Sequence, residues 1–446
     1  MSIVTKSIGI AKKVKHLISE SSESDKNALL SPVRRIERIK TEQRVCAMTF
    51  DDGPCRLPAS PGGKIPLTIS LLESLEKFGA RGTFDIVGDT SANYPDEAGK
   101  QGSAAWGGVR YDHYPDIYKD SDGGAVSCPE IVERIISGGH EITNHTYSHV
   151  LFGKKNVVYG KRRHLNGVSD VIDDISRLHN YIKDNFGYEM TLSRPPHYVD
   201  SISGEYSSYD AYAATGYQYM AASYDGAGWL PLADYEAEVR AMWEDMERKL
   251  MDDPDYFCGQ IIFQKDGYNM ARRSPVADGL EIQLEILDRY NYKVLTVSEL
   301  LNVSPFRDTD CSDNCFDAAK RMLEYGYSIC YRDNTLRPEA PLTRGELAMM
   351  VYGRRATIDK ITQKPRGFSD LKTEHPYAAA AITAVRNGSM ASQEGKFHPN
   401  HPVTKPEFEK LIDIHFPERK CISLPDSFSH AQTIILLDTL ASSGTV

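Results

Sequence analysis

The stretch VCAMTFDDGP, residues 45–54, decides the fold, because a short apolar run ends in two carboxylates and a Gly-Pro turn. Such a run is typical of a buried β-strand, and the Gly-Pro pair ends it. In a parallel α/β domain, ligands bind at the carboxyl ends of the strands. Two neighbouring carboxylates repel each other unless a cation binds one of them. Asp51 and Asp52 are therefore predicted to be a free base beside a metal ligand.

Apolar runs and amphipathic stretches alternate after this strand, as far as about Val303. The expected strands are Val45–Phe50, Thr83–Val87, Tyr219–Ser223, Ile261–Phe263 and Lys293–Val297. The expected helices are Ser70–Phe78, Pro129–Ser137, Val168–Phe186, Tyr235–Leu250 and Ala277–Tyr290. Strands separated by helices predict βα units with a parallel sheet or barrel. Residues 90–126 interrupt the alternation, and a loop of this length is usually functional.

A pair of histidines, His145 and His149, lies in the stretch GHEITNHTYSH at residues 139–149. Residues i and i+4 share one face of a helix, so both imidazoles can bind one ion. Joined to the Asp-Asp strand end, the pair predicts a two-histidine, one-carboxylate site with open positions, as in catalytic metal sites. The spacing of His140 to His145 fits no shared helical face, so we expect His140 to be structural or to support a ligand.

Three motifs together resemble the polysaccharide deacetylases of the NodB-homology type: TFDDGP, the HxxxH pair and the RPPH that begins at Arg194. The resemblance covers about residues 45–300 and implies a distorted (β/α)7-8 barrel. It implies hydrolysis of acetyl groups, N-acetyl or O-acetyl, on a polysaccharide or cell-wall glycan. The implied cofactor is a divalent metal, usually zinc, with cobalt, nickel or manganese as alternatives.

The same resemblance assigns roles to five residues of the base and metal half of the site. It implies Asp51 as the general base and Arg194 as the residue that orients the base. The implied metal ligands are Asp52, His145 and His149.

The acid half of the site departs from the family's pattern. The family's late strand motif supplies a histidine as general acid, and Lys265 stands at that position. The family's Asp-Trp pair tunes that histidine, and here Gly228 replaces the Asp before Trp229. We expect Trp229 and Asp225 to contact the substrate. The backbone N–H of His197, where the family usually has Tyr, is the expected oxyanion donor.

Expulsion of an amine needs a proton donor, which typically contributes about 10²–10⁴-fold to the rate. Lys265 can donate this proton if desolvation and a nearby metal lower its pKa towards neutrality. His197 and His113, the latter from the 90–126 loop, are the other candidates. Two alternatives stand beside the deacetylase interpretation. One is a catalytically inactive barrel that keeps its metal and binds sugar, and the other is a C–N hydrolase with a non-polysaccharide substrate.

A repeat begins after Ser304-Pro305. Phe306-Arg307-Asp308 recurs as Phe368-Ser369-Asp370, and LTRGEL at residues 342–347 recurs as VTKPEF at residues 403–408. Each copy has an Ala-rich helix, a turn that contains proline, and a Thr three residues before a Glu, which is the spacing of a capping box. We expect a degenerate third half-copy, reduced to its helix, at about residues 427–440.

This pattern resembles S-layer homology repeats over about residues 304–416. The resemblance implies helical modules that bind anionic secondary cell-wall polymers of Gram-positive bacteria, with Arg344 and Lys405 as contacts. A cation at a helix start adds to the positive end of the helix dipole, which favours an anion. The alternative is that these helices only pack on the barrel or form a dimer.

Composition and charge limit the remaining possibilities for the 446 residues. The net charge of −10 argues against general binding of nucleic acid, because phosphates would be repelled. No apolar run reaches the roughly 18 residues of a membrane span. Both resemblances imply the cell surface or cell wall, but residues 1–20 show no secretory signal, so the cytoplasm is the alternative. The expected domains are a basic arm (1–44), the barrel (45–303), two repeats (304–362 and 363–418) and a degenerate half-repeat or tail (419–446).

Overall fold

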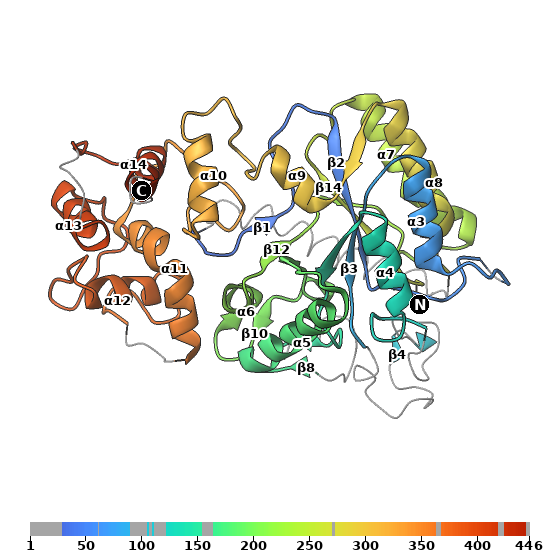
Figure 1. Ribbon diagram of the computed structural model, residues 1–446, viewed down its shortest axis with the longest axis horizontal. Coiled ribbons are helices and arrows are strands. Elements are labelled where there is room, and N and C mark those ends of the chain that lie inside the picture. Colours follow the sequence, from blue (N-terminus) through green and yellow to red (C-terminus); the bar gives the residue numbers. More distant parts are fainter. Residues whose placement is uncertain are drawn as a thin grey trace. The chain divides into compact units, whose positions relative to one another are not determined.

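Figure 1 shows the computed structural model of the chain. The structure describes residues 29–60, 62–89, 105–106, 109–110, 122–153, 164–269, 273–362, 367–417 and 423–442. The chain forms two compact units. Among the described residues, the first unit contains residues 36–303, and the second combines residues 29–35 with residues 304–442.

The first unit is built on a nine-stranded sheet. Its described strand order is β1-β12-β9-β6-β3-β2-β14-β13, with β15 beside β2. The strands are β1 (Arg35–Ile36), β2 (Val45–Asp51), β3 (Thr83–Ile86), β6 (Glu141–Asn144), β9 (Leu192–Ser193), β12 (Gln218–Met220), β13 (Tyr224–Asp225), β14 (Ile261–Lys265) and β15 (Lys293–Leu295). The seven strands that run from β12 to β13 in this spatial order, together with β15, are joined by parallel pairings. The fold is thus the expected distorted (β/α) barrel, left open between β1 and β13.

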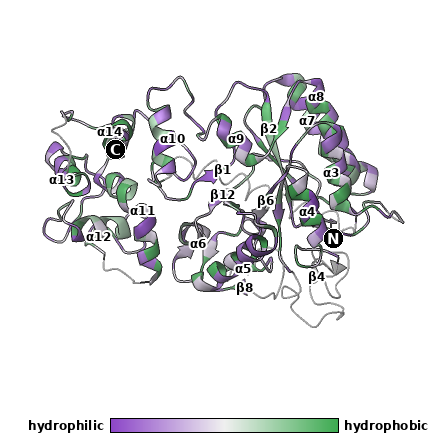
Figure 2. Ribbon diagram, viewed as in Figure 1, coloured by the Kyte–Doolittle hydropathy of each residue, from purple (hydrophilic) through white to green (hydrophobic). Residues whose placement is uncertain are grey.

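Strand β2 is an internal strand of this sheet, and every residue of it is buried. Its first half pairs with β15 and its second half with β3, while β14 lies along its other edge. Figure 2 shows β2 as mostly hydrophobic, as a strand covered on both faces requires. Two strands, β3 and β14, therefore hold the carboxyl end of β2, where the predicted site begins.

Helices cover the sheet and connect its strands. They are α3 (Leu67–Lys77), α4 (Pro129–Ser137), α5 (Val168–Phe186), α6 (Ser208–Thr215), α7 (Tyr235–Asp252), α8 (Val276–Arg289) and α9 (Val297–Val303). Helix α5 shows why they form: Asp170 accepts a hydrogen bond from the Gly167 N–H at its start, and Gly187 ends it with a φ of 65°. Every strand and helix expected in residues 45–303 is present, with ends that differ by a few residues.

Smaller pairings flank the barrel. They are β4 (Ala105–Trp106) with β5 (Val109–Arg110), β7 (Leu151–Phe152) with β8 (His164–Leu165), and β10 (Ser201–Ile202) with β11 (Tyr206–Ser207). The first hairpin falls within the expected 90–126 loop, most of which lies outside the described residues. His113, one candidate acid, is outside them too. Within the described ranges, no helix is long and apolar enough to cross a lipid bilayer.

The second unit is helical. Its helices are α10 (Phe316–Glu324), α11 (Arg344–Thr362), α12 (Ala378–Arg386), α13 (Lys405–His415) and α14 (His430–Ser442). They share one apolar core, and Leu30, from near the start of the described chain, is fully buried in it. The Leu30 N–H donates to the Tyr377 hydroxyl (3.0 Å), and the Ser31 N–H donates to the Cys330 carbonyl (3.1 Å).

The described part of the expected basic arm is therefore integrated into the two units. Residues 29–35 belong to the helical unit, and the chain enters the barrel at Ile36. The physical reason is the apolar spacing of Leu30, Val33, Ile36 and Ile39, all of which are buried. The remainder of the arm, residues 1–28, lies outside the described residues.

Candidate metal centre and active site

Four polar side chains form one row across the carboxyl ends of four neighbouring strands. Lys265 of β14 pairs in register with Asp51 of β2, Asp51 with Asp85 of β3, and Asp85 with Thr143 of β6. Residues in register on neighbouring parallel strands point to the same face of the sheet. All four are buried, with exposed fractions of 0 to 7%. Buried charges need partners, so this row must be part of a larger polar cluster.

The predicted base, Asp51, is held by an arginine. The Arg194 guanidinium is fully buried and forms an ion pair with Asp51 through Nη1. It also donates from Nη2 to Thr49 Oγ1 (3.1 Å) and from Nε to the Met220 carbonyl (3.2 Å). Burial raises the pKa of Asp51 to about 7, although Arg194 and His145 oppose the rise. A carboxylate with a pKa near neutrality suits a general base at neutral pH.

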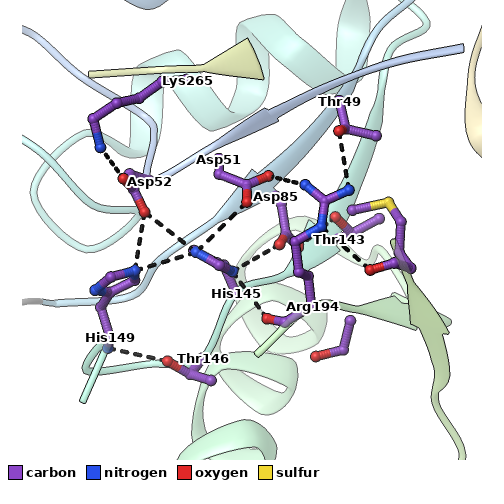
Figure 3. Close-up of polar contacts among 12 residues, drawn as sticks. Thr49, Asp51, Asp52, Asp85, Thr143, His145, Thr146, His149, Arg194 and Lys265 are labelled. Atoms are coloured by element: carbon purple, nitrogen blue, oxygen red, sulfur yellow. Dashed lines mark hydrogen bonds and ion pairs between the residues drawn. The ribbon is translucent and has the colours of Figure 1, made fainter. Parts of the chain in front are cut away.

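The three predicted metal ligands converge beside this base (Figure 3). Asp52 Oδ1 lies 3.2 Å from His145 Nε2 and 2.9 Å from His149 Nε2, and the two Nε2 atoms are 3.2 Å apart. A tetrahedral ion with bonds of about 2.05 Å places its ligand atoms about 3.3 Å apart, and an octahedral ion about 2.9 Å apart. The triangle of donor atoms therefore fits one small divalent cation.

Asp51 and Asp52 reach the same rim because the strand ends between them. Adjacent residues within a strand point to opposite faces. Asp52, however, has a φ of 78°, in the left-handed region, so the chain turns at that residue. This bend lets both carboxylates face the same rim.

The two histidines meet in a different way from the one predicted. Residues 145–150 follow β6 as an irregular turn and not as a helix, so the interpretation as one helical face was wrong. Thr146 and His149 have φ values of 73° and 53°, which fold the chain back tightly. The Asn144 side chain accepts from the Thr146 N–H (2.9 Å), and Thr146 Oγ1 accepts from the His149 N–H (3.0 Å). The turn brings together the nitrogens that a helix was expected to align.

His140 takes no part in the ligand triangle. Its Nδ1 accepts a hydrogen bond from the Gly82 N–H (3.0 Å), and its ring meets Phe84 edge-on. Burial lowers the pKa of His140 to about 4. It therefore joins the segments that precede β3 and β6, as expected for a structural histidine.

Sequence reasoning missed Asp85, which contacts a predicted ligand. Asp85 Oδ2 lies 2.8 Å from His145 Nδ1, and the Arg194 carbonyl lies 2.9 Å from the same nitrogen. Burial opposes charge on His145, but Asp85 and Asp51 raise the pKa of His145 well above its usual value. The signal in the sequence was a carboxylate inside the otherwise uncharged strand TFDI.

Lys265, at the position of the family's acid, forms an ion pair with Asp52 Oδ2. Burial opposes ionisation of Asp52, but Lys265 and His149 hold its pKa well below the usual value. Asp52 thus presents one oxygen to the histidines and the other to Lys265. The ring of His197 lies 5.4 Å from that of His149, and burial keeps the pKa of His197 well below its usual value. His197 has a φ of 54° within the short helix η3 (Pro196–Tyr198).

Asp225 and Trp229 contact each other. The Trp229 indole N–H donates to Asp225 (3.0 Å), and so does the Ala227 N–H (2.9 Å). A Cβ atom at Gly228 would lie 2.4 Å from Val276 of α8, so a larger residue does not fit there. The absence of the family's Asp at residue 228 is therefore enforced by packing.

The two cations predicted to bind wall polymer differ in their surroundings. Arg344 is buried, donates to the carbonyls of Phe397 (2.9 Å) and Ala391 (2.6 Å), and forms an ion pair with Glu407. Burial lowers the pKa of Arg344. Lys405 is half-buried at the start of α13, and no hydrogen bond or ion pair joins it to another described residue.

Helix α14, where we expected a degenerate half-copy, begins in the same way as α11. At the start of α11 the Arg344 and Gly345 N–H groups donate to the carbonyls of His401 and Pro399. At the start of α14 the His430 and Ala431 N–H groups donate in the same way to Ala340 and Pro338. The His430 side chain, equivalent to Arg344, stacks on Tyr331 and lies 3.5 Å from Glu346. Both helices therefore begin against a proline turn of another copy.

Similar chains among solved structures include the following three. PdaC from Bacillus subtilis, a peptidoglycan deacetylase, is 22% identical with a TM-score of 0.38, over 60% of this chain and 94% of that chain. The chitin deacetylase of the fungal pathogen Colletotrichum lindemuthianum is 16% identical with a TM-score of 0.41, over 61% and 92%. A CE4 family pseudoenzyme from Bacillus anthracis is 14% identical with a TM-score of 0.39, over 61% and 70%.

Comparison with curated sequences and family models gives further matches. The chain is 26% identical over 275 residues to the peptidoglycan-N-acetylmuramic acid deacetylase PdaC of Bacillus subtilis (strain 168). The match covers 61% of this chain but only 42% of that relative. Residues 38–220 match the family model described as polysaccharide deacetylase, and residues 367–409 match that of the S-layer homology domain. The chain therefore contains a polysaccharide deacetylase domain followed by an S-layer homology domain.

Proposed function

We propose that the barrel is a metal-dependent hydrolase that removes acetyl groups from a glycan, with Asp51 as general base. One observation carries the proposal: the donor atoms of Asp52, His145 and His149 converge within 2.9–3.2 Å of one another, next to Asp51. Asp51 Oδ2 lies 3.9 Å from His145 Nε2, so the base borders the triangle. When bound there, a divalent ion, which we propose is zinc, would supply Lewis-acid polarisation of an acetyl carbonyl and its attacking water.

The chain's own residues supply the remaining functions. Asp51 accepts the proton of the attacking water, and its ion pair with Arg194 fixes the direction of its carboxylate. The backbone N–H of His197 donates to the oxyanion that forms from the acetyl carbonyl. Lys265 donates a proton to the departing amine. Trp229 lines the substrate side of the rim, with its indole held by Asp225.

The substrate we propose is the acetylated amino sugar of peptidoglycan, because the curated relative is named for N-acetylmuramic acid. The S-layer homology domain supports a location at the cell wall, where that substrate occurs. We propose that this domain binds an anionic wall polymer through Lys405. Arg344 can join that contact only if it leaves Glu407.

The test is acetate release by the full chain from three acetylated glycans: peptidoglycan muropeptides, N-acetylglucosamine oligomers and acetylxylan. The zinc-loaded protein is compared with protein stripped by a chelator and then dialysed. We expect release that depends on zinc and is greatest on muropeptides.

A second function has one observation in its favour. Lys265 forms an ion pair with the carboxylate that should bind the metal, which suits a barrel that binds sugar without hydrolysing it. Binding of acetylated oligomers by the zinc-loaded protein, with no acetate release from any of the three, would establish this inactive binder and reject the hydrolase.

A further inference from the structure

We propose that Asp85 is a positioning residue of the metal centre, which orients His145 for the ion and offsets the positive charge of Lys265. The inference rests on the proposed metal site and deepens it. The sheet fixes the place of Asp85, because β3 pairs with β2 in a register that sets Asp85 beside Asp51. Asp85 is fully buried, so it faces the cluster and not solvent.

The first part of the inference concerns the proton on His145. Nδ1 of this ring forms its hydrogen bond with the Arg194 carbonyl (2.9 Å), while Asp85 Oδ2, which has no hydrogen-bond partner among the described residues, lies 2.8 Å from the same nitrogen as an ion-pair partner. Nδ1 therefore carries the hydrogen when a metal binds, which leaves Nε2 as the ligand atom. Figure 3 shows this nitrogen facing Asp52 and His149. A histidine that binds a metal almost always donates its other N–H to such a partner, and loss of a partner costs about 10–100-fold in metal affinity.

The Asp85 carboxylate is itself held in place. Its Oδ1 accepts a hydrogen bond from Thr143 Oγ1 (2.6 Å), the next residue in the row across the strand ends. One oxygen is thus fixed by the sheet and the other is directed at His145. This arrangement limits rotation of the imidazole, because the ring can keep its contact with Asp85 in only one orientation.

The second part concerns charge. Asp51 forms an ion pair with Arg194, and Asp52 forms one with Lys265, so basic side chains of the chain already pair with these two carboxylates. Asp85 contacts His145 instead. In a buried cluster, where charges interact strongly, this third carboxylate restores the attraction for a divalent cation that Lys265 reduces.

Isothermal titration of zinc into the full chain tests both parts. We expect Asp85→Asn to weaken zinc binding about 10–100-fold, since an amide oxygen accepts more weakly and carries no charge. We expect Lys265→Met to strengthen zinc binding about tenfold, and the double variant to lie between the two. Asp255→Asn, which changes an exposed carboxylate of the same unit, should bind zinc as the wild type does.

The visible spectrum of the cobalt-loaded protein separates positioning from a general structural role. Asp85→Asn should alter the intensity of the cobalt absorption bands, because a tilted His145 changes the ligand geometry, while the melting temperature of the metal-free protein stays close to that of the wild type. Unchanged zinc affinity together with an unchanged cobalt spectrum in Asp85→Asn would overturn the role of Asp85 alone. A wild-type chain that binds neither metal would overturn the metal centre and this role together.

Discussion

The barrel rim and the helix starts of the repeat unit both gather buried charges, but they use them differently. At the rim, the ligand atoms of Asp52, His145 and His149 face one another across about 3 Å, and one cation between them would contact all three. In the repeat unit, Arg344 is satisfied by Glu407 and two carbonyl groups of the chain itself. Several metal-ligating atoms that face one another indicate a ligand site. A cation paired with a carboxylate and carbonyl groups of the same chain indicates a structural contact.

The largest expected effect concerns Asp51 at the barrel rim. Asp51→Asn should lower the rate of acetate release by about 10²–10⁴-fold, because an amide cannot accept the proton of the attacking water. Its carbonyl oxygen can still accept from Arg194, so zinc affinity should change little. The measurement is steady-state acetate release with zinc titration on the same samples, and Asp255→Asn is the control. Equal rates for Asp51→Asn and the control would remove Asp51 from the chemistry.

The next effect is a pH dependence confined to the repeat unit. Burial opposes ionisation of Glu346, but His430, Thr343 and Tyr331 lower its pKa from 4.5 to about 2. Because the folded pKa is depressed, the stabilisation is complete above pH 4.5 and is lost as pH falls towards 2. A shift of this size corresponds to roughly 3 kcal/mol.

Hydrogen exchange of the α11 and α14 amides in the full chain measures this contribution. Glu346→Gln should be less stable than the wild type at pH 6, and the difference should shrink as pH falls below 4.5. A difference that stays constant between pH 6 and pH 2.5 would mean that Glu346 is not ionised through these contacts.

A smaller effect separates the two repeat cations. Arg344→Met leaves Glu407 and two carbonyls without their donor, so it should destabilise the repeat unit by about 1–3 kcal/mol. Lys405→Met, at the equivalent position, should cost less than about 0.5 kcal/mol, because a half-buried cation without such contacts contributes little. Hydrogen exchange of α11 and α13 distinguishes them. Equal destabilisation by both substitutions would show that the comparison does not hold for these helices.

Sedimentation with purified wall material tests the same pair for binding. Lys405→Met should reduce the fraction of the full chain that sediments more than Arg344→Met does, since the Arg344 guanidinium is already engaged. The opposite order would show that Arg344 leaves Glu407 to bind the polymer.

The smallest effect tests the acid side of the rim. Trp229→Phe removes the indole N–H that donates to Asp225, and it should destabilise the barrel by about 0.5–1.5 kcal/mol. Chemical denaturation followed by far-UV circular dichroism measures this change. We expect acetate release to fall far less than in Asp51→Asn. A loss of rate as large as that of Asp51→Asn would place Asp225 and Trp229 in the chemistry.

Local pattern predicted most of the barrel and the ligand triangle. Asp51 and Asp52 were recognisable because an apolar strand ends at them, and this depends only on neighbouring residues. The prediction of a helix for His145 and His149 was wrong because the chain turns through left-handed backbone at Thr146 and His149. Glycine usually marks such positions in a sequence, and neither residue is a glycine. Periodicity alone does not reveal such a turn.

What the sequence could not predict depends on pairing across the chain. Asp85 becomes a neighbour of His145 only through the order and register of β2, β3 and β6. Leu30 is held in the repeat unit by an antiparallel β-bridge to Tyr331. Arg344 forms an ion pair with Glu407, which belongs to the other copy of the repeat. These contacts join residues distant in sequence, and one sequence holds no signal for their register.

The path of the chain through the two units has a mechanical consequence. Within the described residues, the repeat unit contains chain from both sides of the barrel, so this part of the barrel is an insertion joined at two crossings, Arg35–Ile36 and Val303–Ser304. A single proteolytic nick at either crossing leaves the barrel tethered through the other. A fragment that starts at Ser304 would also lack Leu30, and with it a buried part of the core. Release of the barrel from its partner unit therefore takes two cuts.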